Sequence, residues 1–335
     1  MEKDKILEVE DLKVSFHTYA GEVKAVRGVD FDLHKGEVKA LVGESGCGKS
    51  VTAKAVLRLL GDNAEIKEES RIEFEGRDVK SFQKAELTDY KGNEVAMIFQ
   101  DPMTSLNPTM TIGNQIKESF KIHRKMTKEE MDREVIKLLE LVNISEPEKR
   151  AKQYPHQLSG GLRQRVMISI ALACNPKILI ADEPTTALDV TIQAQILDLL
   201  EELKEKLDMA IILITHDLGV VANFADTIEV MYAGEVMESG TVDEIFEEAE
   251  HPYTWALLRS IPKINTESDD TYLYSLDGTP PDLIMDIPGC PFADRCDYSM
   301  KICKEARPAK TNYSDTHYSK CWLAHDLAPE IEKPV

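Results

Sequence analysis

A glycine-rich turn carries the clearest chemistry in this sequence. Residues 43–50 read GESGCGKS and hold every fixed position of a P-loop, with an apolar run before them and a helical pattern after them. Glycines let backbone amides approach phosphate oxygens, and the N-terminus of the following helix adds partial positive charge. We therefore expect Lys49 to reach the β- and γ-phosphates of a nucleotide and the Ser50 hydroxyl to bind Mg²⁺.

Two adjacent acids, Asp182 and Glu183, follow the apolar run Ile178–Ala181. Such a run is typical of a buried strand in a parallel sheet, and ligands bind at the carboxyl ends of these strands. We expect Asp182 to hold Mg²⁺, directly or through water, and Glu183 to polarise the attacking water as a general base. An exposed acidic turn is the alternative for the pair alone, but the P-loop favours a hydrolytic site.

A second helix start with anion-binding character lies at Ser159, Gly160 and Gly161. The serine hydroxyl and the amides that follow it can bind an anion, although an ordinary N-cap has the same residues. Two phosphate-binding helix starts in one chain indicate that they share a nucleotide, either within the chain or across a dimer.

The segments that position these motifs alternate between strand and helix, which predicts an α/β domain. Strands are expected at 6–9, 12–16, 25–33, 38–42, within 70–79, and at 95–99, 178–181 and 210–214, and 227–231 and 235–237 are expected to form a closing hairpin. Helices are expected at 50–60, within 103–157, and at 159–174, 187–207, 218–225 and 251–261. Thr127 and Glu130 have the spacing of a capping box at the start of a helix.

Composition narrows the class of protein. The chain has 335 residues, of which 42% are hydrophobic, so it can form a sizeable core. Its formal net charge of -20 argues against a broad nucleic-acid-binding face and against docking on an anionic bilayer by charge alone. No apolar run approaches the roughly 18 residues of a membrane helix, and the charged N-terminus has no signal-peptide pattern. We expect a soluble chain of the cytoplasm.

Together these motifs resemble the ATPase subunit of an ABC transporter, in the family's order and over residues 6–240. The stretch 158–164 (LSGGLRQ) is similar to the family signature, and Gln100 to the Q-loop glutamine, a Mg²⁺ ligand. Residues 186–189 resemble the D-loop, and His216 the switch histidine that contacts the γ-phosphate.

The resemblance implies a P-loop, RecA-like core with an antiparallel β subdomain and a helical subdomain at about 103–175, within an ATPase domain of residues 1–250. It implies catalytic roles for Glu183, His216 and Gln100, and Mg²⁺ held by Ser50, Gln100 and Asp182. Adenine would stack on Phe16 or Tyr19, and the spacing does not decide between them. The residues expected to bind ATP are Gly43, Ser45, Gly46, Cys47, Gly48, Lys49, Ser50, Thr52, Phe16, Tyr19, Gln100, Asp182, Ser159, Gly160, Gly161 and Asp189.

The resemblance also implies partners. Two such domains close around two ATP molecules, each held by the P-loop of one subunit and the signature serine of the other. The second domain is a homologous ATPase subunit or a second copy of this chain. Their motion drives two membrane permease subunits, which receive cargo from an extracytoplasmic binding protein, so the chain is expected at the cytoplasmic face of the membrane as a peripheral subunit.

A narrower resemblance points to the cargo. Residues 99–108, 251–258 and 288–296 are similar to stretches of the dipeptide/oligopeptide permease ATPases, a group that also contains nickel and oligosaccharide importers. The ATPase chain does not touch the cargo, so peptides are inferred by association only. A soluble ABC ATPase acting on nucleic acid or ribosomes is the remote alternative, because this chain has neither a second cassette nor a coiled-coil insertion.

Four of the six cysteines lie near the C-terminus, in an extension of residues 251–335. In a reducing compartment they are expected as free thiols or metal ligands. Four thiolates suit zinc or an iron–sulfur cluster, and the absence of a Cys-x-x-Cys pair favours the larger cluster. The resemblance implies a [4Fe–4S] cluster, while zinc, free thiols and a disulfide stay open. His317 and His325 are alternative ligands or solvated side chains. The four cysteines are Cys290, Cys296, Cys303 and Cys321.

Overall fold

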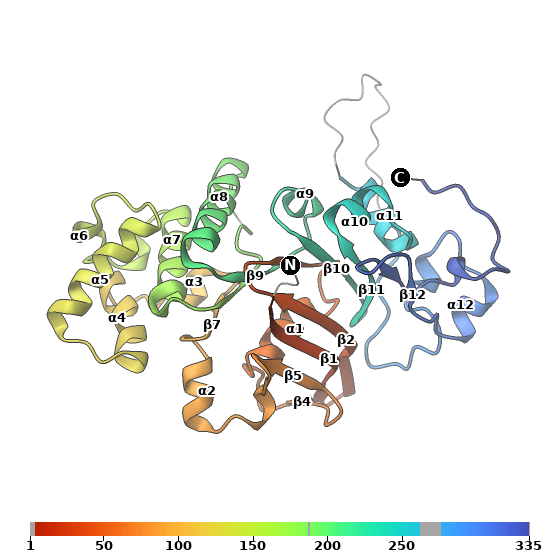
Figure 1. Cartoon of the computed structure of the whole chain (residues 1–335), viewed down its shortest axis with the longest axis horizontal. Helices are drawn as coiled ribbons and strands as arrows, with labels where there is room; N and C mark the ends of the chain where they lie inside the picture. The colour runs from red at the N-terminus through yellow and green to blue at the C-terminus, as the bar shows by residue number, and fades with distance from the viewer. Residues whose placement is uncertain (1–3, 187, 262–275, 335) are drawn as a thin grey trace, which may run out of the picture. The chain divides into compact units, whose positions relative to one another are not determined.

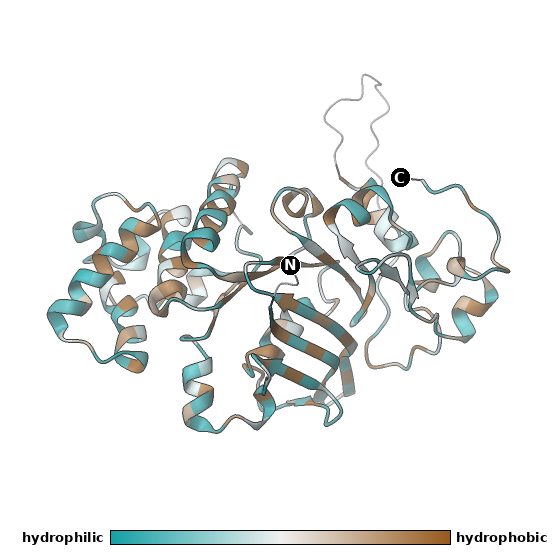
Figure 2. Cartoon of the chain, in the orientation of Figure 1, coloured by the Kyte–Doolittle hydropathy of each residue, from teal (hydrophilic) through white to brown (hydrophobic). Residues whose placement is uncertain are grey.

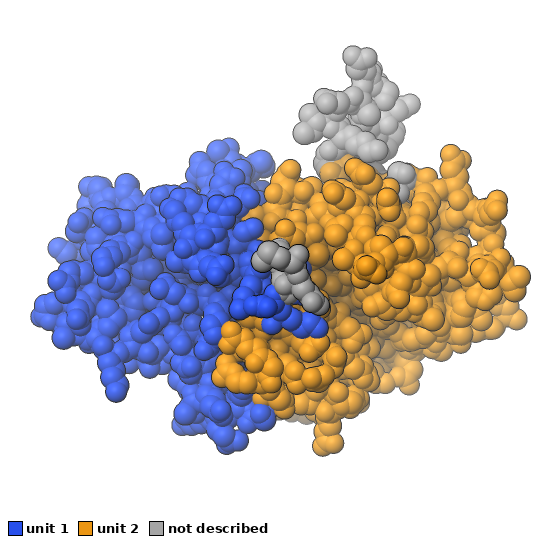
Figure 3. All heavy atoms as spheres, in the orientation of Figure 1, with its two compact units in different colours: residues 1–5, 34–37, 81–214 blue, residues 6–33, 38–80, 215–335 orange. Residues whose placement is uncertain are grey.

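The structure, a computed structural model, describes residues 4–186, 188–261 and 276–334 (Figure 1). Its chain divides into two compact units (Figure 3). Unit 1 comprises residues 1–5, 34–37 and 81–214, and unit 2 comprises residues 6–33, 38–80 and 215–335. Among the described residues, no helix has both the length and the apolar character that crossing a membrane requires.

Unit 1 contains three parallel strands, β7 (Val95–Ile98), β8 (Ile178–Asp182) and β9 (Ala210–Thr215). Every residue of β8 and β9 is buried, which explains why both read as continuous apolar runs. The predicted strands at 178–181 and 210–214 are confirmed. Ile98 and Ala181 are register partners, so the segments that follow β7 and β8 leave the sheet side by side.

The helices of unit 1 include the predicted helical region. They are α2 (Lys84–Tyr90), α3 (Pro102–Ser105), α4 (Ile112–His123), α5 (Lys128–Leu141), α6 (Pro147–Arg150), α7 (Gly160–Ala171) and α8 (Val190–Leu207). The capping box before α5 is confirmed, because the Glu130 amide donates to the Thr127 hydroxyl and the Thr127 amide to the Glu130 carboxylate. Helix α8 begins at Val190 because the Asp189 side chain caps it, accepting a hydrogen bond from the Ile192 amide at 3.0 Å.

The first sheet of unit 2 is antiparallel, in the order β2-β1-β5-β6, with β4 beside β1. Figure 2 shows the alternation of apolar and polar residues along its strands. The predicted strands 6–9 and 12–16 form one long strand, whose two halves pair with different neighbours, β5 and β4. The bounds are β1 (Lys5–Thr18), β2 (Gly21–His34), β4 (Ala64–Ile66), β5 (Arg71–Phe74) and β6 (Arg77–Asp78).

The second set of strands in unit 2 has the order β12-β13-β11-β10-β3. Strand β3 (Val38–Val42) runs parallel to β10 (Thr227–Tyr232), which forms the predicted hairpin with β11 (Glu235–Thr241). The small strands β12 (Thr311–Asn312) and β13 (Tyr318–Ser319) add a C-terminal hairpin to β11. The helices are α1 (Lys49–Val56), α9 (Leu218–Val221), α10 (Val242–Glu247), α11 (Pro252–Arg259) and α12 (Lys301–Glu305).

Candidate nucleotide-binding site

The P-loop joins β3 to α1 within unit 2 and leaves no room for side chains at two of its glycines. A Cβ atom at Gly43 would lie 2.1 Å from the Met231 carbonyl oxygen, and one at Gly48 would lie 2.6 Å from that of Ala25. Gly48 is also the N-cap of α1 with φ 103° and supplies no side-chain cap. The turn is therefore held tightly by backbone approach, and an N-cap glycine lets backbone amides approach a phosphate closely.

Lys49 is buried with 5% of its surface exposed, and its ammonium contacts the backbone of the P-loop. Its Nζ donates to the carbonyl oxygens of Gly43 at 2.7 Å and Glu44 at 2.9 Å. These two bonds place a positive charge at the glycine-rich turn, where phosphate oxygens can exchange with the carbonyls as partners. Thr52, which was also expected to bind ATP, is fully buried in α1.

Gln100 and Glu183 meet within unit 1. The Gln100 Nε2 donates to the Glu183 Oε2 at 2.6 Å, and the Thr186 hydroxyl donates to the same oxygen at 2.9 Å. Glu183 has φ 46°, a left-handed conformation that a non-glycine residue adopts only when its surroundings require it. The carboxylate is thus held in one orientation at the end of β8, next to Asp182, of which 4% is exposed.

The signature serine caps α7. Ser159 Oγ accepts a hydrogen bond from the Leu162 amide at 3.4 Å, so the ordinary N-cap geometry is present. Ser159 and Gly160 are both exposed. A Cβ atom at Gly161 would lie 3.0 Å from the Ile192 side chain of α8, so glycine here allows the two helices to pack closely.

The predicted site residues are divided between the two units. The P-loop, Phe16, Tyr19 and His216 belong to unit 2, whereas Gln100, Ser159, Asp182, Glu183 and Asp189 belong to unit 1. His216 is exposed after β9, while Phe16 is half-buried in β1 and Tyr19 is fully exposed. The structure brings together Gln100 with Glu183 in one unit, and Lys49 with the glycine-rich turn in the other.

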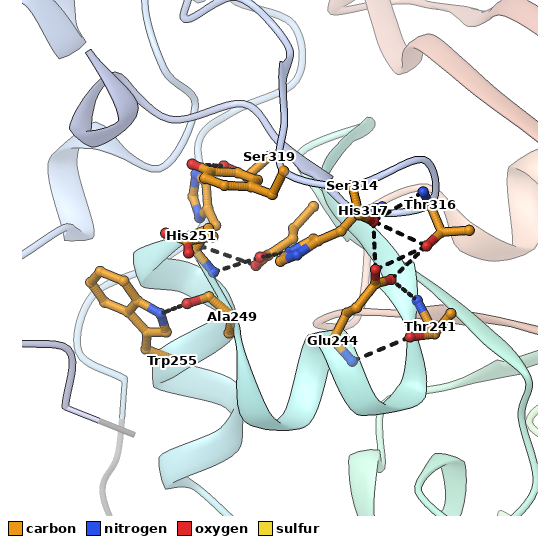
Figure 4. Close-up of polar contacts among 12 residues, drawn as sticks. Thr241, Glu244, Ala249, His251, Trp255, Ser314, Thr316, His317 and Ser319 are labelled. Carbon is orange, nitrogen blue, oxygen red and sulfur yellow. Dashed lines mark hydrogen bonds and ion pairs between the residues drawn. The ribbon is translucent and has the colours of Figure 1, made fainter. Parts of the chain in front are cut away.

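The C-terminal extension is anchored on Glu238, a fully buried residue of β11. Its carboxylate accepts hydrogen bonds from the amides of Glu250 at 2.6 Å and His251 at 3.1 Å, and bonds His317 Nε2 at 2.9 Å (Figure 4). The Glu238 bond raises the pKa of His317, whereas burial lowers the pKa of His251 to about 4. The expectation that His317 is a metal ligand or a solvated side chain is wrong, because it is 2% exposed and bonded to Glu238.

The four C-terminal cysteines line one small cavity as free thiols, so the disulfide alternative is not observed. Burial raises the pKa of Cys290 and Cys321 to about 12 and that of Cys296 to about 11. Among the described residues, no group of three or more His, Cys, Asp or Glu could hold a metal ion. The zinc or [4Fe–4S] site expected at Cys290, Cys296, Cys303 and Cys321 is therefore not supported by the described residues.

Comparison with known proteins decides the family. Residues 26–186 match the family described as ABC transporter, and residues 237–303 match the C-terminal region of oligopeptide/dipeptide transporters. The chain is 54% identical over 330 residues to the oligopeptide transport ATP-binding protein OppD of Bacillus subtilis (strain 168), covering 98% of this chain and 92% of OppD. The chain belongs to the ABC transporter family. As a member it is the ATP-binding subunit, whose ATP hydrolysis drives transport.

Another relative and a solved structure agree with the assignment to the ABC transporter family. The dipeptide transport ATP-binding protein DppD of Bacillus subtilis (strain 168) is 52% identical over 325 residues, which is 97% of this chain and 96% of DppD. The dimeric ATP-binding cassette MJ0796, in a post-hydrolysis state with ADP and Pi, has a TM-score of 0.63 and 27% identity, covering 71% of this chain and 99% of that one. The expected cassette fold with mixed α and β content is confirmed.

Sequence reasoning missed three residues at the P-loop of the ABC transporter subunit. It assigned roles to the glycines and Lys49 but none to Glu44, whose amide donates to the Tyr253 hydroxyl at 2.9 Å and whose carboxylate pairs with Arg295. Tyr253 and Arg295 both lie in stretches that resemble the peptide-permease group. That shared location is the only signal in the sequence that could have drawn attention to them.

Proposed function

We propose that this subunit binds Mg-ATP at its P-loop and hydrolyses it with Glu183 as the general base. The observation that carries the proposal is the fixed Glu183 carboxylate, which accepts hydrogen bonds from Gln100 and Thr186 at the end of a buried parallel strand. A carboxylate held in this way can orient a water and accept its proton. Lys49 binds the phosphates, and His216 contacts the γ-phosphate.

Ser50, Gln100 and Asp182 would hold Mg²⁺. Hydroxyl, amide and carboxylate oxygens are the hard ligands that this ion prefers, so the donor set fits. Bound Mg²⁺ neutralises charge on the phosphate oxygens. The remaining predicted contacts to ATP are the P-loop residues of the same subunit, Thr52, Asp189, an aromatic side chain at Phe16 or Tyr19, and the signature residues Ser159, Gly160 and Gly161, whose serine comes from the opposing subunit.

We propose oligopeptides or dipeptides as the cargo. The support is the high identity to proteins named for oligopeptide and dipeptide transport, together with the match at residues 237–303. Import of nickel or oligosaccharides is the alternative with the same motor. The proposed partners are two membrane permease subunits, a second ATPase subunit or a second copy of this chain, and indirectly an extracytoplasmic binding protein, but no nucleic acid. The chain then works peripherally at the cytoplasmic face.

Substitution of the general base tests the hydrolytic mechanism. Glu183→Gln keeps the shape of the side chain but removes its basicity, so we expect ATP to bind, hydrolysis to fall roughly 1,000-fold, and a closed ATP-bound dimer to accumulate. Size-exclusion chromatography with Mg-ATP, beside the wild-type chain with and without nucleotide, measures the dimer. Wild-type turnover with no trapped dimer would refute the role of Glu183.

We also propose that Cys290, Cys296, Cys303 and Cys321 bind a [4Fe–4S] cluster rather than zinc. The support for the cluster is that the four thiols line one cavity, and that four thiolates are the ligand set of such a cluster. Iron, sulfide and zinc assays on anaerobically purified protein test this. About four iron atoms per chain with a broad visible band support it; zinc alone, or no metal, refutes it.

A further inference from the structure

We propose that Arg295 is a positioning residue for ATP binding, which holds the P-loop in shape through Glu44. The proposal rests on the assignment of the P-loop as the ATP site and adds a part of the chain to it. Arg295 lies in the C-terminal extension, at the end of a short 3-10 turn (Ala293–Arg295) between Cys290 and Cys296. Its partner Glu44 is the second residue of the P-loop, 251 positions earlier in the chain.

The Arg295 side chain is 6% exposed, and each of the five N–H groups of its guanidinium donates a hydrogen bond. It grips the Glu44 carboxylate in a two-pronged pair, Nη1 to Oε2 at 2.6 Å and Nη2 to Oε1 at 3.0 Å. Its remaining N–H groups donate to the Tyr232 hydroxyl at 3.1 Å and to the carbonyls of Leu276 at 3.3 Å and Asp277 at 2.9 Å. A buried guanidinium with five satisfied donors has one orientation, and it imposes that orientation on Glu44.

The carboxylate, the amide and the carbonyl of Glu44 each make a hydrogen bond, so a shift of the Glu44 side chain would also move the P-loop backbone. Its carboxylate binds Arg295, its amide donates to the Tyr253 hydroxyl at 2.9 Å, and its carbonyl accepts from Lys49 Nζ at 2.9 Å. The residue that Arg295 holds is therefore one of the two whose carbonyls place the Lys49 ammonium. Without the Arg295 contact, Glu44 would hold Lys49 Nζ less firmly, and the backbone amides that bind phosphate would be less well ordered.

Three buried aromatic side chains pack against the Arg295–Glu44 pair and restrict its movement. Tyr232, Tyr253 and Phe292 pack with ring centroids 4.7–5.3 Å apart, and none of the three exposes more than 2% of its surface. The Arg295 guanidinium lies 5.7 Å from the centre of the Tyr232 ring. Since Phe292 and Arg295 both belong to the cysteine-containing segment, the packing of that segment is linked directly to the P-loop.

Charge gives a second reason for the pair. Glu44 puts a carboxylate in a loop that must attract the polyanionic phosphates of ATP, and 28% of its side chain remains exposed. A guanidinium paired with both oxygens neutralises that carboxylate where the phosphates approach. Lysine in place of Arg295 would keep the charge but lose the fork, so Arg295→Lys separates geometry from charge.

The test measures ATP affinity and turnover on the full-length chain. We expect Arg295→Ala to raise the KM for ATP and the Kd for a fluorescent ATP analogue about tenfold while kcat changes less than about twofold, because the loss is one charge-assisted contact that organises binding. Arg295→Lys should raise KM about threefold. Glu44→Ala loses the same clamp but also removes the carboxylate that repels phosphate, so it should raise KM by less than Arg295→Ala does, and the double variant should be no worse than Arg295→Ala alone.

Arg307→Ala is the matched control. Arg307 is another arginine of the extension, but it pairs with Glu235 and the Ile287 carbonyl rather than with the P-loop, so its KM should stay at the wild-type value. A wild-type KM in folded Arg295→Ala overturns the proposal, as do additive effects in the double variant. If Arg295→Ala does not fold, wild-type KM in both Arg295→Lys and Glu44→Ala overturns it. Failure of the wild-type chain to bind ATP would instead refute the proposed function.

Discussion

The P-loop and the cysteine segment, residues 290–321, are both recognised in the sequence by the spacing of a few residues. The P-loop spans eight consecutive residues, from the end of β3 into the first turn of α1, so its phosphate-binding groups are neighbours in the chain. The cysteine segment runs through two short helices and a small hairpin, and its four thiols line a cavity without forming a metal-ion site in the part of the chain that the structure describes. A motif within one turn brings its own ligand-binding groups together, whereas a dispersed motif depends on packing to bring its members together.

The two regions also differ in what holds them. Backbone approach and the Lys49 contacts organise the P-loop, and Arg295 adds a clamp from outside it. The extension depends on one buried carboxylate, Glu238, and on Glu244, which accepts hydrogen bonds from the hydroxyls of Ser314 and Thr316 (Figure 4). The comparison therefore predicts that single changes at the P-loop affect ligand binding, and single changes at Glu238 affect folding.

The largest expected effect is at Lys49. Lys49→Ala removes the ammonium from the phosphate-binding turn, and we expect ATP affinity to fall at least 100-fold, as the loss of charge-assisted contacts to phosphate implies. Titration with a fluorescent ATP analogue measures it. The thermal midpoint should change little, because a local motif carries its function without holding the fold. Wild-type affinity, or a collapse of the fold, would contradict the comparison.

Glu238→Ala should reduce stability, in contrast to Lys49→Ala, which should reduce ATP affinity. It leaves two amides and the paired His317 without their buried acceptor, so the free energy of unfolding should fall by about 3–5 kcal/mol. Urea denaturation measures this loss. Glu247→Ala, an exposed change on α10, is the matched control and should stay within about 0.5 kcal/mol of wild type. Equal free energies of unfolding for the two variants would contradict the assignment of Glu238 as the residue that anchors the extension.

The acid side of the stability profile should depend on His251. Burial lowers its folded pKa to about 4, against 6.5 in an unfolded chain, so the unfolded chain binds more protons in this window. Stability present above pH 6.5 is lost as the pH falls toward 4, by on the order of 3 kcal/mol. His251→Asn retains a capping acceptor for the Tyr253 amide and should reduce that loss. An unchanged acid limb would show that His251 is not its source.

His317 should give a smaller effect of opposite sign. Its folded pKa is raised by Glu238, so its contribution to stability is fully present below pH 6.5 and is lost as the pH rises through the raised value. His317→Gln should therefore flatten the alkaline limb of the profile and leave the loss below pH 6 in place. Denaturation midpoints at several pH values separate the two histidines, and a variant with the wild-type alkaline limb would contradict this assignment.

Local patterns predicted much of the fold correctly. The buried strands 178–181 and 210–214, the hairpin at 227–237 and the capping box at Thr127 and Glu130 all follow from residues close together in the chain. Predictions that needed distant partners did worse. Two short strands became the single strand β1 because β4 and β5 pair with different parts of it, and His317 proved to be buried against Glu238 rather than solvated.

The sequence by itself determined the family, the P-loop and the order of the nucleotide motifs, because their chemistry depends on residues a few bonds apart. Only the tertiary structure decided that Gln100 reaches Glu183, that one carboxylate anchors two histidines, and that Arg295 grips Glu44 across 251 positions. These contacts join segments whose separation along the chain carries no distance information. Packing of the sheets and of the aromatic side chains brings them within hydrogen-bonding range.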